Sequence, residues 1–313
     1  MPTTLALRRG LLAVSGPDAE SFLQGVMTTN LLRLAPAQAA PGLFLNAKGR
    51  VAFDVLVYRA ARDRLLLDCA SSAPLAKYLA MYRLRKKVTV EDLSASHRAV
   101  FTTTPPPADA LCGFADPRPG MQSTYRAWLP ASAVTASSDD ALYHHMRMAS
   151  GIAEGPGEAS EETAFVLNCD MWDACLSYEK GCYTGQELVA RTHFKGQVRR
   201  RIMPCLFDSL GGGLADPLLP AFASAKLGTG SMSGVSVGAE VHALEEAEDE
   251  TAAAAAAAVG KVIALAPAPR GWLGLVSLRD PWPGAFTGQF APTHRVGSVK
   301  LQAVRPAWWT VSM

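Results

Sequence analysis

Residues 180–191, KGCYTGQELVAR, carry the most distinctive pattern of the chain. Gly181 and Gly185 bracket a cysteine and a tyrosine, and helix-forming residues follow. The spacing predicts that Cys182 lies on a tight turn at or just before the start of a helix. Backbone N–H groups and the helix dipole stabilise a negative sulfur there, and Lys180 adds a positive charge. Such a thiolate is a nucleophile and a soft ligand for iron, although a lone cysteine between glycines is more often a small buried residue.

Outward from this segment, short apolar runs alternate with helical patterns as far as about residue 198. The run over 5–14 predicts one strand, which turns at 15–18 into a short amphipathic helix. Apolar runs separated by turn residues predict an antiparallel meander over 43–46, 51–58 and 64–68. One helix is predicted over 74–86, with basic residues at its C-terminal end. A second helix is predicted after the capping residues 137–140.

The remainder of the chain, from about Arg199, has the pattern of a small β-barrel or sandwich. Its short hydrophobic runs are separated by Gly, Pro and Ser clusters and lie at 202–207, 233–241, 260–266, 272–278 and 295–301. An acidic stretch followed by seven alanines, over 245–258, interrupts the pattern. We interpret it as an inserted surface loop or small helix.

Length and composition exclude several classes of protein. At roughly 100 to 200 residues per domain, 313 residues predict two or three compact units. With 49% hydrophobic and 19% charged residues the chain is not disordered. A net charge of +2 is too small for the whole protein to attract polyanions through its overall electrostatic field. Six scattered cysteines favour a reducing compartment. No apolar run reaches the roughly 20 residues that cross a bilayer, so we expect no membrane partner, and no signal peptide follows Met1.

Residues 180–191 match the K-G-C-Y-x-G-Q-E signature of the YgfZ family, folate-binding relatives of the glycine-cleavage aminomethyltransferase, so the chain resembles that family. Further matches follow in the same order, at 16–19, 22–24, 29–30, 44–46, 49–50, Asp54, Arg147 and 151–152. The stretch over 82–88 is similar to the eukaryotic branch of the family. The resemblance covers most of residues 5–205 and, more loosely, the β-rich end.

The resemblance implies an α+β fold in three parts, a cloverleaf of two α+β units and a C-terminal β-barrel around a central hole. The folate-binding region would cover residues 1–198, as two intertwined subdomains formed by about 1–45 with 97–198 and by 46–96. Residues 199–313 would form the barrel. A tetrahydrofolate-sized pocket is expected between these parts.

The family's role implies an iron–sulfur cluster assembly factor that acts late in [4Fe–4S] maturation with an A-type carrier protein. Cys182 would be a ligand of a [2Fe–2S] or [4Fe–4S] cluster shared transiently with that partner, or a redox thiol. The residues expected to bind a tetrahydrofolate derivative are Lys180, Tyr183, Gln186, Glu187, Arg191 and Asp54. We expect a monomer in the mitochondrial matrix, with a plastid or a bacterial cytoplasm as alternatives, and a transit peptide that has been removed.

Several of these residues also have ordinary structural interpretations. Glu187 and Arg191 lie at i,i+4 spacing and form an exposed ion pair in the simplest interpretation. Asp54 at a strand position can bond a neighbouring backbone group. The alternative function is a tetrahydrofolate-dependent aminomethyl transferase, but Phe53 stands where that enzyme carries a second acidic residue. Loss of this carboxylate argues against the transfer reaction, which needs a positioned acid or base.

A self-contained iron site at Cys169, Cys175 and Cys182 is disfavoured, because clusters held by one protein usually need four thiolates. We interpret Cys169 and Cys175 as packing residues. His144 and His145 are adjacent, so on a helix they point roughly 100° apart and are weak metal candidates. His193 follows the 180–191 segment and is a secondary candidate for contact with the cluster.

A basic cluster at the end of the predicted helix over 74–86 permits three interpretations. The basic side chains are simply exposed to water at the end of the helix, they form a docking patch for an acidic partner, or they bind polyglutamate or nucleic acid. Its residues are Arg83, Arg85, Lys86 and Lys87. The solvated end is the default, and we expect no salt-sensitive binding of nucleic acid.

Overall fold

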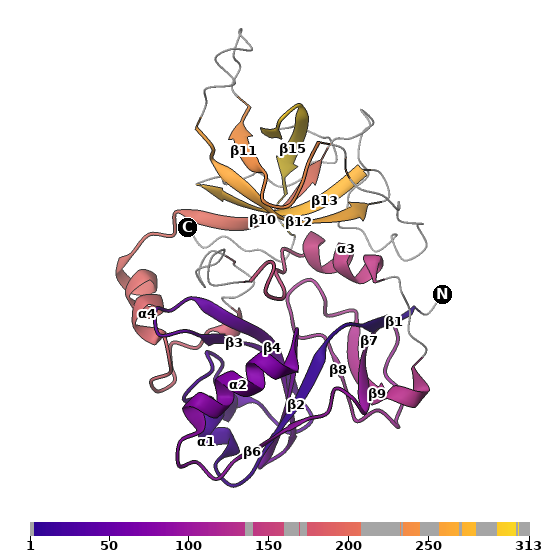
Figure 1. Ribbon diagram of the computed structural model, residues 1–313, viewed down its shortest axis with the longest axis vertical. Coiled ribbons are helices and arrows are strands. Elements are labelled where there is room, and N and C mark those ends of the chain that lie inside the picture. Colours follow the sequence, from indigo (N-terminus) through magenta and orange to yellow (C-terminus); the bar gives the residue numbers. More distant parts are fainter. Residues whose placement is uncertain are drawn as a thin grey trace. The chain divides into compact units, whose positions relative to one another are not determined.

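The structure is a computed structural model that describes residues 3–134, 140–159, 169, 174–207, 232, 234–244, 257–268, 271–279, 293–304 and 306. The chain forms two compact units (Figure 1). The first contains Met1–Asp140, Glu154–Leu167 and Met171–Gln197. The second contains Ala141–Ala153, Asn168–Asp170 and Val198–Met313. The boundaries at 198 and 199 and the subdivision of 1–198 stay a prediction.

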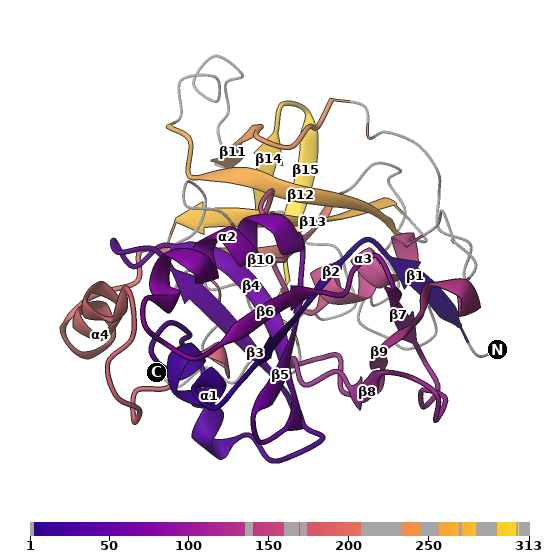
Figure 2. The ribbon, with the colours of Figure 1, turned by 60° about the horizontal axis from the view of Figure 1, so that its bottom comes forward.

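A five-stranded antiparallel sheet organises the first unit, in the order β3-β4-β5-β2-β6. Its strands are β2 (Gly10–Ser15), β3 (Ala39–Leu45), β4 (Val51–Ala61), β5 (Arg64–Cys69) and β6 (Thr89–Asp92). The predicted meander is confirmed, because β4 pairs with both β3 and β5. Helices α1 (Ala19–Gln24) and α2 (Ser72–Arg83) lie against this sheet (Figure 2). Phe22 and Leu23 of α1 and Leu75 and Leu79 of α2 enter its hydrophobic core.

The apolar run over 5–14 is two strands in different sheets, so the prediction of one strand is wrong. Strand β1 (Thr4–Leu7) joins a four-stranded sheet in the order β1-β7-β9-β8, while β2 belongs to the five-stranded sheet. The other strands are β7 (His97–Thr102), β8 (Cys112–Ala115) and β9 (Tyr125–Pro130). The chain changes sheet at Arg8 and Arg9, because the guanidinium of Arg9 is buried in an ion-pair network.

Helix α2 ends at Arg83, earlier than the predicted end at residue 86. Leu84 has φ +44° and ψ −118°, which is incompatible with an α-helix. Lys86 N donates a 2.9 Å hydrogen bond to Arg83 O, which closes a tight turn. Three of the four basic residues therefore follow the helix instead of forming its last turn. The described residues of this unit also form two short 3₁₀ helices, η1 (Leu31–Arg33) and η2 (Ala131–Ala133), and helix α4 (Gln186–Lys195).

A closed six-stranded barrel forms the second unit, in the order β10-β13-β12-β11-β14-β15. Its strands are β10 (Arg200–Phe207), β11 (Glu240–Ala243), β12 (Gly260–Ala268), β13 (Gly271–Arg279), β14 (His294–Val296) and β15 (Val299–Ala303). Side chains such as Met203, Val276 and Leu301 fill its interior. The predicted α+β class with a C-terminal barrel is confirmed.

Two predicted barrel strands differ from those observed. The run over 233–241 becomes a strand only at Glu240, after turns at Gly234 and Gly238, which have positive φ. The run over 295–301 is split into β14 and β15 by a turn at Gly297. Helix α3 (Ala141–Ala149), expected after 137–140, packs on β12 and β13. Most of the acidic and alanine stretch, residues 245–256, lies outside the described residues.

Candidate functional site

Cys182 lies in an irregular segment directly before helix α4 (Gln186–Lys195), as the glycine spacing predicts. Its side chain is exposed to solvent. The other five cysteines are buried, including Cys169 and Cys175. Burial raises the pKa of the Cys69 and Cys112 thiols to about 12, so these groups stay protonated. Cys182 is therefore the thiol that a reagent or a partner can reach.

Gly185 fixes the position of this segment against the turn between β3 and β4. Its φ of +80° suits glycine, and a Cβ atom there would lie 2.5 Å from the carbonyl oxygen of Asn46. Gly49, across the contact, has φ +72° and would place a Cβ 3.0 Å from the carbonyl oxygen of Gly185. Two backbones thus approach more closely than side chains allow. A Cβ at Gly181 would meet nothing within 4 Å, so that glycine has no such packing role.

Lys180 holds the segment from the other end. Its Nζ donates hydrogen bonds to the carbonyl oxygens of Met27 (2.6 Å) and Thr29 (2.9 Å). Burial lowers the pKa of Lys180 to about 8. The same Nζ lies 5.1 Å from the ring centroid of Tyr183, within cation–π range. The ammonium is thus engaged with backbone oxygens and an aromatic face.

Backbone contacts continue this attachment along residues 25–29. The hydroxyl of Thr28 donates to the carbonyl oxygen of Cys175 at 2.7 Å, and Ser177 N donates to Thr28 O at 3.1 Å. Thr184 N donates to Gly25 O at 3.2 Å. The main chain is therefore anchored on both sides of Cys182, while its thiol faces solvent.

The other predicted residues of the segment divide between core and surface. Tyr183 is buried, and burial raises the pKa of its hydroxyl to about 12. Gln186 is half-buried at the start of α4. Glu187 and Arg191 form an exposed ion pair of 2.5 Å, the ordinary interpretation of their spacing. Their roles in folate binding stay a prediction.

An aromatic cluster joins the half-buried Tyr178, which precedes the 180–191 segment, to the exposed His193 and Phe194 of α4. The rings of Tyr178 and His193 stack with centroids 3.8 Å apart. Phe194 packs edge-on against both rings and is 68% exposed. An exposed phenylalanine held by two neighbouring rings is typical of an interaction surface. The sequence analysis singled out only His193 of this cluster.

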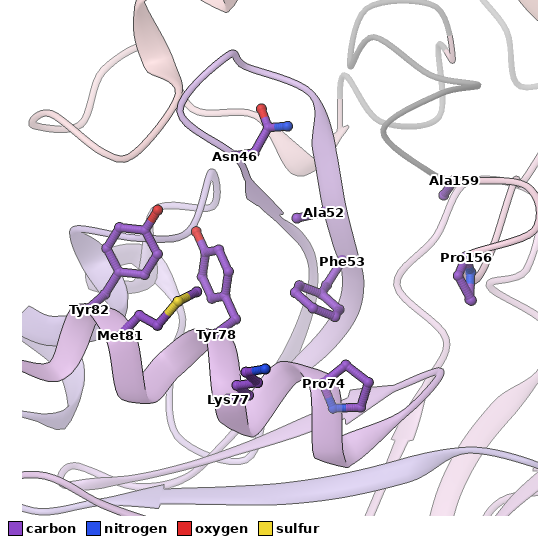
Figure 3. Close-up of a pocket in the computed structure, with 10 residues that line it drawn as sticks. All are labelled: Asn46, Ala52, Phe53, Pro74, Lys77, Tyr78, Met81, Tyr82, Pro156 and Ala159. Carbon is purple, nitrogen blue, oxygen red and sulfur yellow. The ribbon is translucent and has the colours of Figure 1, made fainter.

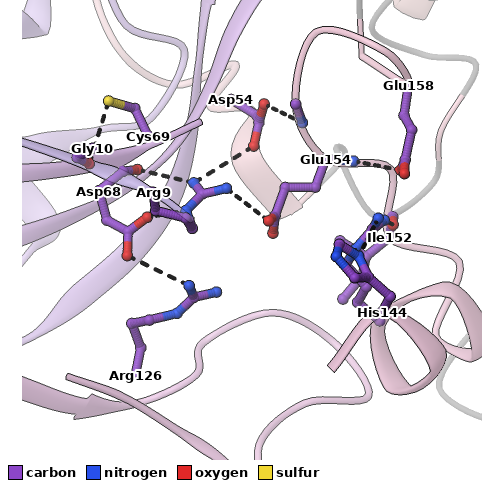
Figure 4. A network of polar contacts seen from close by, with 12 residues as sticks. Arg9, Gly10, Asp54, Asp68, Cys69, Arg126, His144, Ile152, Glu154 and Glu158 are labelled. Carbon is purple, nitrogen blue, oxygen red and sulfur yellow. Dashed lines mark hydrogen bonds and ion pairs between the residues drawn. The ribbon is translucent and has the colours of Figure 1, made fainter. Parts of the chain in front are cut away.

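Asp54 lies in a buried ion-pair network that the sequence analysis missed (Figure 4). Its Oδ1 accepts a 2.8 Å hydrogen bond from Gly155 N, and its Oδ2 lies 3.9 Å from Arg9 Nη2. Arg9 also pairs with Asp68 and, at 2.7 Å, with Glu154. Burial raises the pKa of Asp54, and the Arg9 charge opposes the shift. The charged pair Arg8–Arg9 inside an apolar run was the available signal.

The network extends through Arg118, which pairs with Asp116 and Glu154 at 2.5 Å each. Arg126 Nη1 lies 3.7 Å from Asp68, which also accepts a 3.0 Å hydrogen bond from Trp128 Nε1. Each of these acidic side chains is matched by a guanidinium, and the contacts join segments far apart in sequence. We assign a structural role to the network.

A cavity of about 710 Å³ opens between α2, β4 and residues 156–159 (Figure 3). Aromatic rings line it, with Lys77 and Asn46 as polar groups and Phe53, Tyr78 and Tyr82 as walls. Among the described lining residues, none is one of the six expected to bind folate. Phe53 lines the cavity, whereas its neighbour Asp54 contacts Arg9 and Gly155 in the ion-pair network.

Tyr78 joins this cavity to the 180–191 segment. Its ring lies 5.5 Å from that of Phe53 and 4.7 Å from that of Tyr82, centroid to centroid. Its hydroxyl donates a 2.8 Å hydrogen bond to Leu45 O and also interacts with the side chain of Thr184. The wall of the cavity and the Cys182 loop therefore share one hydrogen-bonded residue.

The remaining metal candidates are accounted for locally. The described residues contain no group of three or more His, Cys, Asp or Glu side chains placed to hold a metal ion. Arg147 donates to His144 Nδ1 at 3.0 Å, and His145 is buried. Cys169 is buried and contacts Gly151 O at 3.5 Å.

In the described part of the chain no helix is long and apolar enough to span a membrane.

Comparison with known proteins places this geometry in a family. The family profile described as the GCVT N-terminal domain matches residues 9–113. The iron–sulfur cluster assembly factor IBA57, mitochondrial, of Mus musculus is 32% identical, and the alignment covers 96% of this chain and 83% of the mouse protein. The chain belongs to the IBA57 family. The resemblance inferred from residues 180–191 is thereby confirmed.

Other IBA57 proteins agree with this assignment. The human IBA57 is 35% identical over 64% of each chain. The IBA57 homologue of Neurospora crassa is 33% identical over 70% of this chain and 56% of its own length, so the chain matches little more than half of that relative. All three are mitochondrial by name, which confirms the predicted mitochondrial location.

Among solved structures, the glycine cleavage system aminomethyltransferase T of Bartonella henselae has the same fold. Its TM-score is 0.66, at 14% sequence identity, over 98% of this chain and 86% of that protein. At this identity the similarity establishes the fold and leaves the activity open.

Proposed function

We propose that the protein assists iron–sulfur cluster assembly, acting late in [4Fe–4S] maturation with an A-type carrier protein. The cluster is the cargo of this process rather than a resident cofactor. The observation that carries the proposal is that Cys182 is exposed on an anchored loop while the other five cysteines are buried. Membership of the IBA57 family supports it.

The arrangement of ligands favours a shared cluster. Protein-bound clusters are usually held by four thiolates, or by two thiolates and two imidazoles in Rieske centres. The described part of the chain brings no three candidate ligands together, so Cys182 supplies one ligand. The partner then supplies the others, and the cluster sits between the two proteins.

The contacts around Cys182 favour a prepositioned ligand. Lys180 and Gly185 fix the backbone on either side of the thiol through hydrogen bonds and a close backbone contact. A ligand held in this way loses less conformational entropy when the cluster binds. Lys180 and Tyr183 therefore act as positioning residues in this proposal.

The aromatic cluster of Tyr178, His193 and Phe194 is the proposed contact for the carrier. Aromatic side chains at the centre of an interface often supply most of the binding energy. Phe194 is 68% exposed and its ring is held by two neighbouring rings, so little order is lost when a partner covers it.

A tetrahydrofolate derivative is the proposed ligand of the cavity beside α2. Its volume, about 710 Å³, lies within the roughly 300–1,000 Å³ of ordinary ligand pockets. Phe53, Tyr78 and Tyr82 offer faces for a pterin ring, and the Lys77 ammonium suits a glutamate carboxylate. Phe53, which packs against Tyr78, occupies the position at which the aminomethyltransferase carries a second carboxylate. We therefore favour binding of the folate derivative without an aminomethyl-transfer reaction.

Anaerobic reconstitution with a purified A-type carrier tests the proposal. The wild type should form a mixed complex with the visible absorption of an iron–sulfur cluster, and Cys182→Ser should lose most of it. Cys112→Ala, which removes a buried thiol, is the matched control and should behave as the wild type. Equal cluster yield and stability in Cys182→Ser and wild type would remove the ligand role of Cys182.

A further inference from the structure

The solvent-facing side of α2 is largely apolar, unlike that of most surface helices. Its exposed side chains are Ala73, Pro74, Lys77, Ala80, Met81 and Arg83. Met81 is 62% exposed, and with Pro74 and Lys77 it lines the cavity beside α2 (Figure 3). A helix on the surface of a globular protein normally turns charged and polar residues outward and apolar residues inward. Helix α2 has apolar residues on both sides.

The turn after α2 displays a leucine in a conformation that glycine prefers. Leu84 has φ +44° and ψ −118°, close to the first central position of a type II′ turn. The hydrogen bond from Lys86 N to Arg83 O closes that turn. Leu84 is 86% exposed. The chain therefore accepts backbone strain to hold a large apolar side chain in solvent, which points to a partner for it.

Positive charge is concentrated around these apolar side chains. From residue 69 to residue 90 the chain has no Asp or Glu. It has five cations in this stretch, all exposed, which are Lys77, Arg83, Arg85, Lys86 and Lys87. Two of these side chains contact neutral oxygens, Arg83 at Val88 O (3.5 Å) and Lys86 at Ser21 Oγ (3.3 Å). The cations are thus available to an anionic surface.

We propose that α2 and the turn at 83–86 form a docking surface for an anionic lipid bilayer, with Met81 and Leu84 inserted at the level of the headgroups. Helices that lie in a membrane interface combine an apolar face with flanking Lys and Arg. Such docking needs no membrane-spanning segment. The proposal goes beyond the proposed function, and its surface shares Lys77 and Met81 with the cavity proposed for folate.

A membrane fits this surface better than an acidic protein does. Lysine is depleted in protein–protein interfaces, where charges of both signs set the register of the partners. Here three of the five cations are lysines, and the carboxylate that contacts this turn, Asp18, accepts a 2.8 Å hydrogen bond from the backbone N of Lys87 and not from a cationic side chain. A fluid bilayer requires no such register, because anionic headgroups move to the cations. Long Lys and Arg side chains also keep their charge at the headgroups while their stems lie on apolar surface.

Flotation of the full chain with lipid vesicles tests the proposal. The vesicles contain equal parts of phosphatidylcholine and phosphatidylglycerol, or phosphatidylcholine alone. We expect binding to the anionic vesicles only, reduced at high salt. The triple variant Arg85→Gln/Lys86→Gln/Lys87→Gln should bind about 100-fold more weakly, since each cation near an anionic surface contributes roughly fivefold. Lys261→Gln/Arg279→Gln/Lys300→Gln removes as many exposed cations from the barrel and should bind as the wild type.

Leu84→Gly separates the membrane role from folding. Glycine accepts the turn conformation without strain, so this variant should unfold at a higher urea concentration than the wild type. Its binding to anionic vesicles should nevertheless fall about tenfold, because the inserted side chain is missing. Cys182→Ser should bind vesicles as the wild type does.

Two results would overturn the proposal. The first is no flotation of the wild type with anionic vesicles. If polyglutamate then binds the wild type and the triple variant loses that binding, the surface is assigned to an acidic protein. The second is equal binding to vesicles of phosphatidylcholine alone.

Discussion

The Lys180 ammonium donates a 2.6 Å hydrogen bond to the carbonyl oxygen of Met27, a residue more than 150 positions earlier in the chain. This bond and its neighbour at Thr29 O, 2.9 Å away, attach the Cys182 loop to the first unit. The lysine of the signature thus acts on the backbone, and its effect on Cys182 is to hold it in place.

Lys180→Met should lower the free energy of unfolding by about 1–3 kcal/mol, because two carbonyl oxygens lose their donor while an apolar chain of similar length remains. Urea unfolding measures this change. Lys48→Met removes an exposed ammonium of the nearby turn and should stay within about 0.5 kcal/mol of the wild type. If both variants have the same unfolding midpoint, the anchoring role of Lys180 is wrong.

Gly185→Ala should destabilise the fold by about 1–3 kcal/mol, because its φ is +80° and the new Cβ would lie 2.5 Å from Asn46 O. Gly181→Ala is the matched control, since a Cβ there meets nothing within 4 Å. Chemical unfolding of the two variants gives the comparison. A loss as large in Gly181→Ala as in Gly185→Ala would contradict the packing argument.

Cys182 should be the one thiol of the six that reacts rapidly with a water-soluble disulfide reagent in the native protein, because the others are buried. Denaturation should release the remaining five. Cys182→Ser should abolish the rapid phase and leave the slow one intact. Rapid titration of two or more thiols in the native wild type would show that a buried cysteine is reachable.

Asp54→Asn should gain stability relative to the wild type as pH rises. Burial raises the pKa of Asp54 above 3.8, so above this pH the folded state holds a proton that the unfolded state has released. The stability that Asp54 contributes is therefore complete at low pH and is lost as pH rises through the folded pKa. Asparagine cannot ionise and can still accept the hydrogen bond from Gly155 N. Urea midpoints measured from about pH 4 to about pH 7 give the difference, and a constant difference would refute the shift.

Phe194→Ala should weaken binding of the A-type carrier by about tenfold or more, because aromatic anchors dominate many interfaces. Calorimetric titration of the carrier measures the affinity. Val237→Ala removes an apolar side chain of similar exposure, 62% against 68%, from the second unit and should leave the affinity unchanged. Unchanged binding in Phe194→Ala would show that the aromatic cluster lies outside the interface.

The sequence correctly predicted those helices and strands that are specified by the pattern of apolar and turn residues within a few positions. The meander of β3, β4 and β5 follows from apolar runs separated by turn residues, and α1 follows from the helical spacing of Phe22, Leu23 and Val26. The start of α4 after Gly185 was predicted for the same reason. The errors occur where distant contacts override the local pattern. The run over 5–14 breaks at Arg9 because its partners Asp68 and Glu154 come from elsewhere in the chain.

The sequence alone determined that a cysteine stands among glycines before a helix, that the fold is α+β with a C-terminal barrel, and which family the chain resembles. These conclusions depend on residue identity and short-range spacing. Only the tertiary structure decided that Cys182 is exposed while five thiols are buried, and that Lys180 donates hydrogen bonds to the carbonyl oxygens of Met27 and Thr29. It also decided that burial raises the pKa of Asp54. Exposure, hydrogen bonding and pKa depend on neighbours brought together by folding, and no short stretch of sequence specifies them.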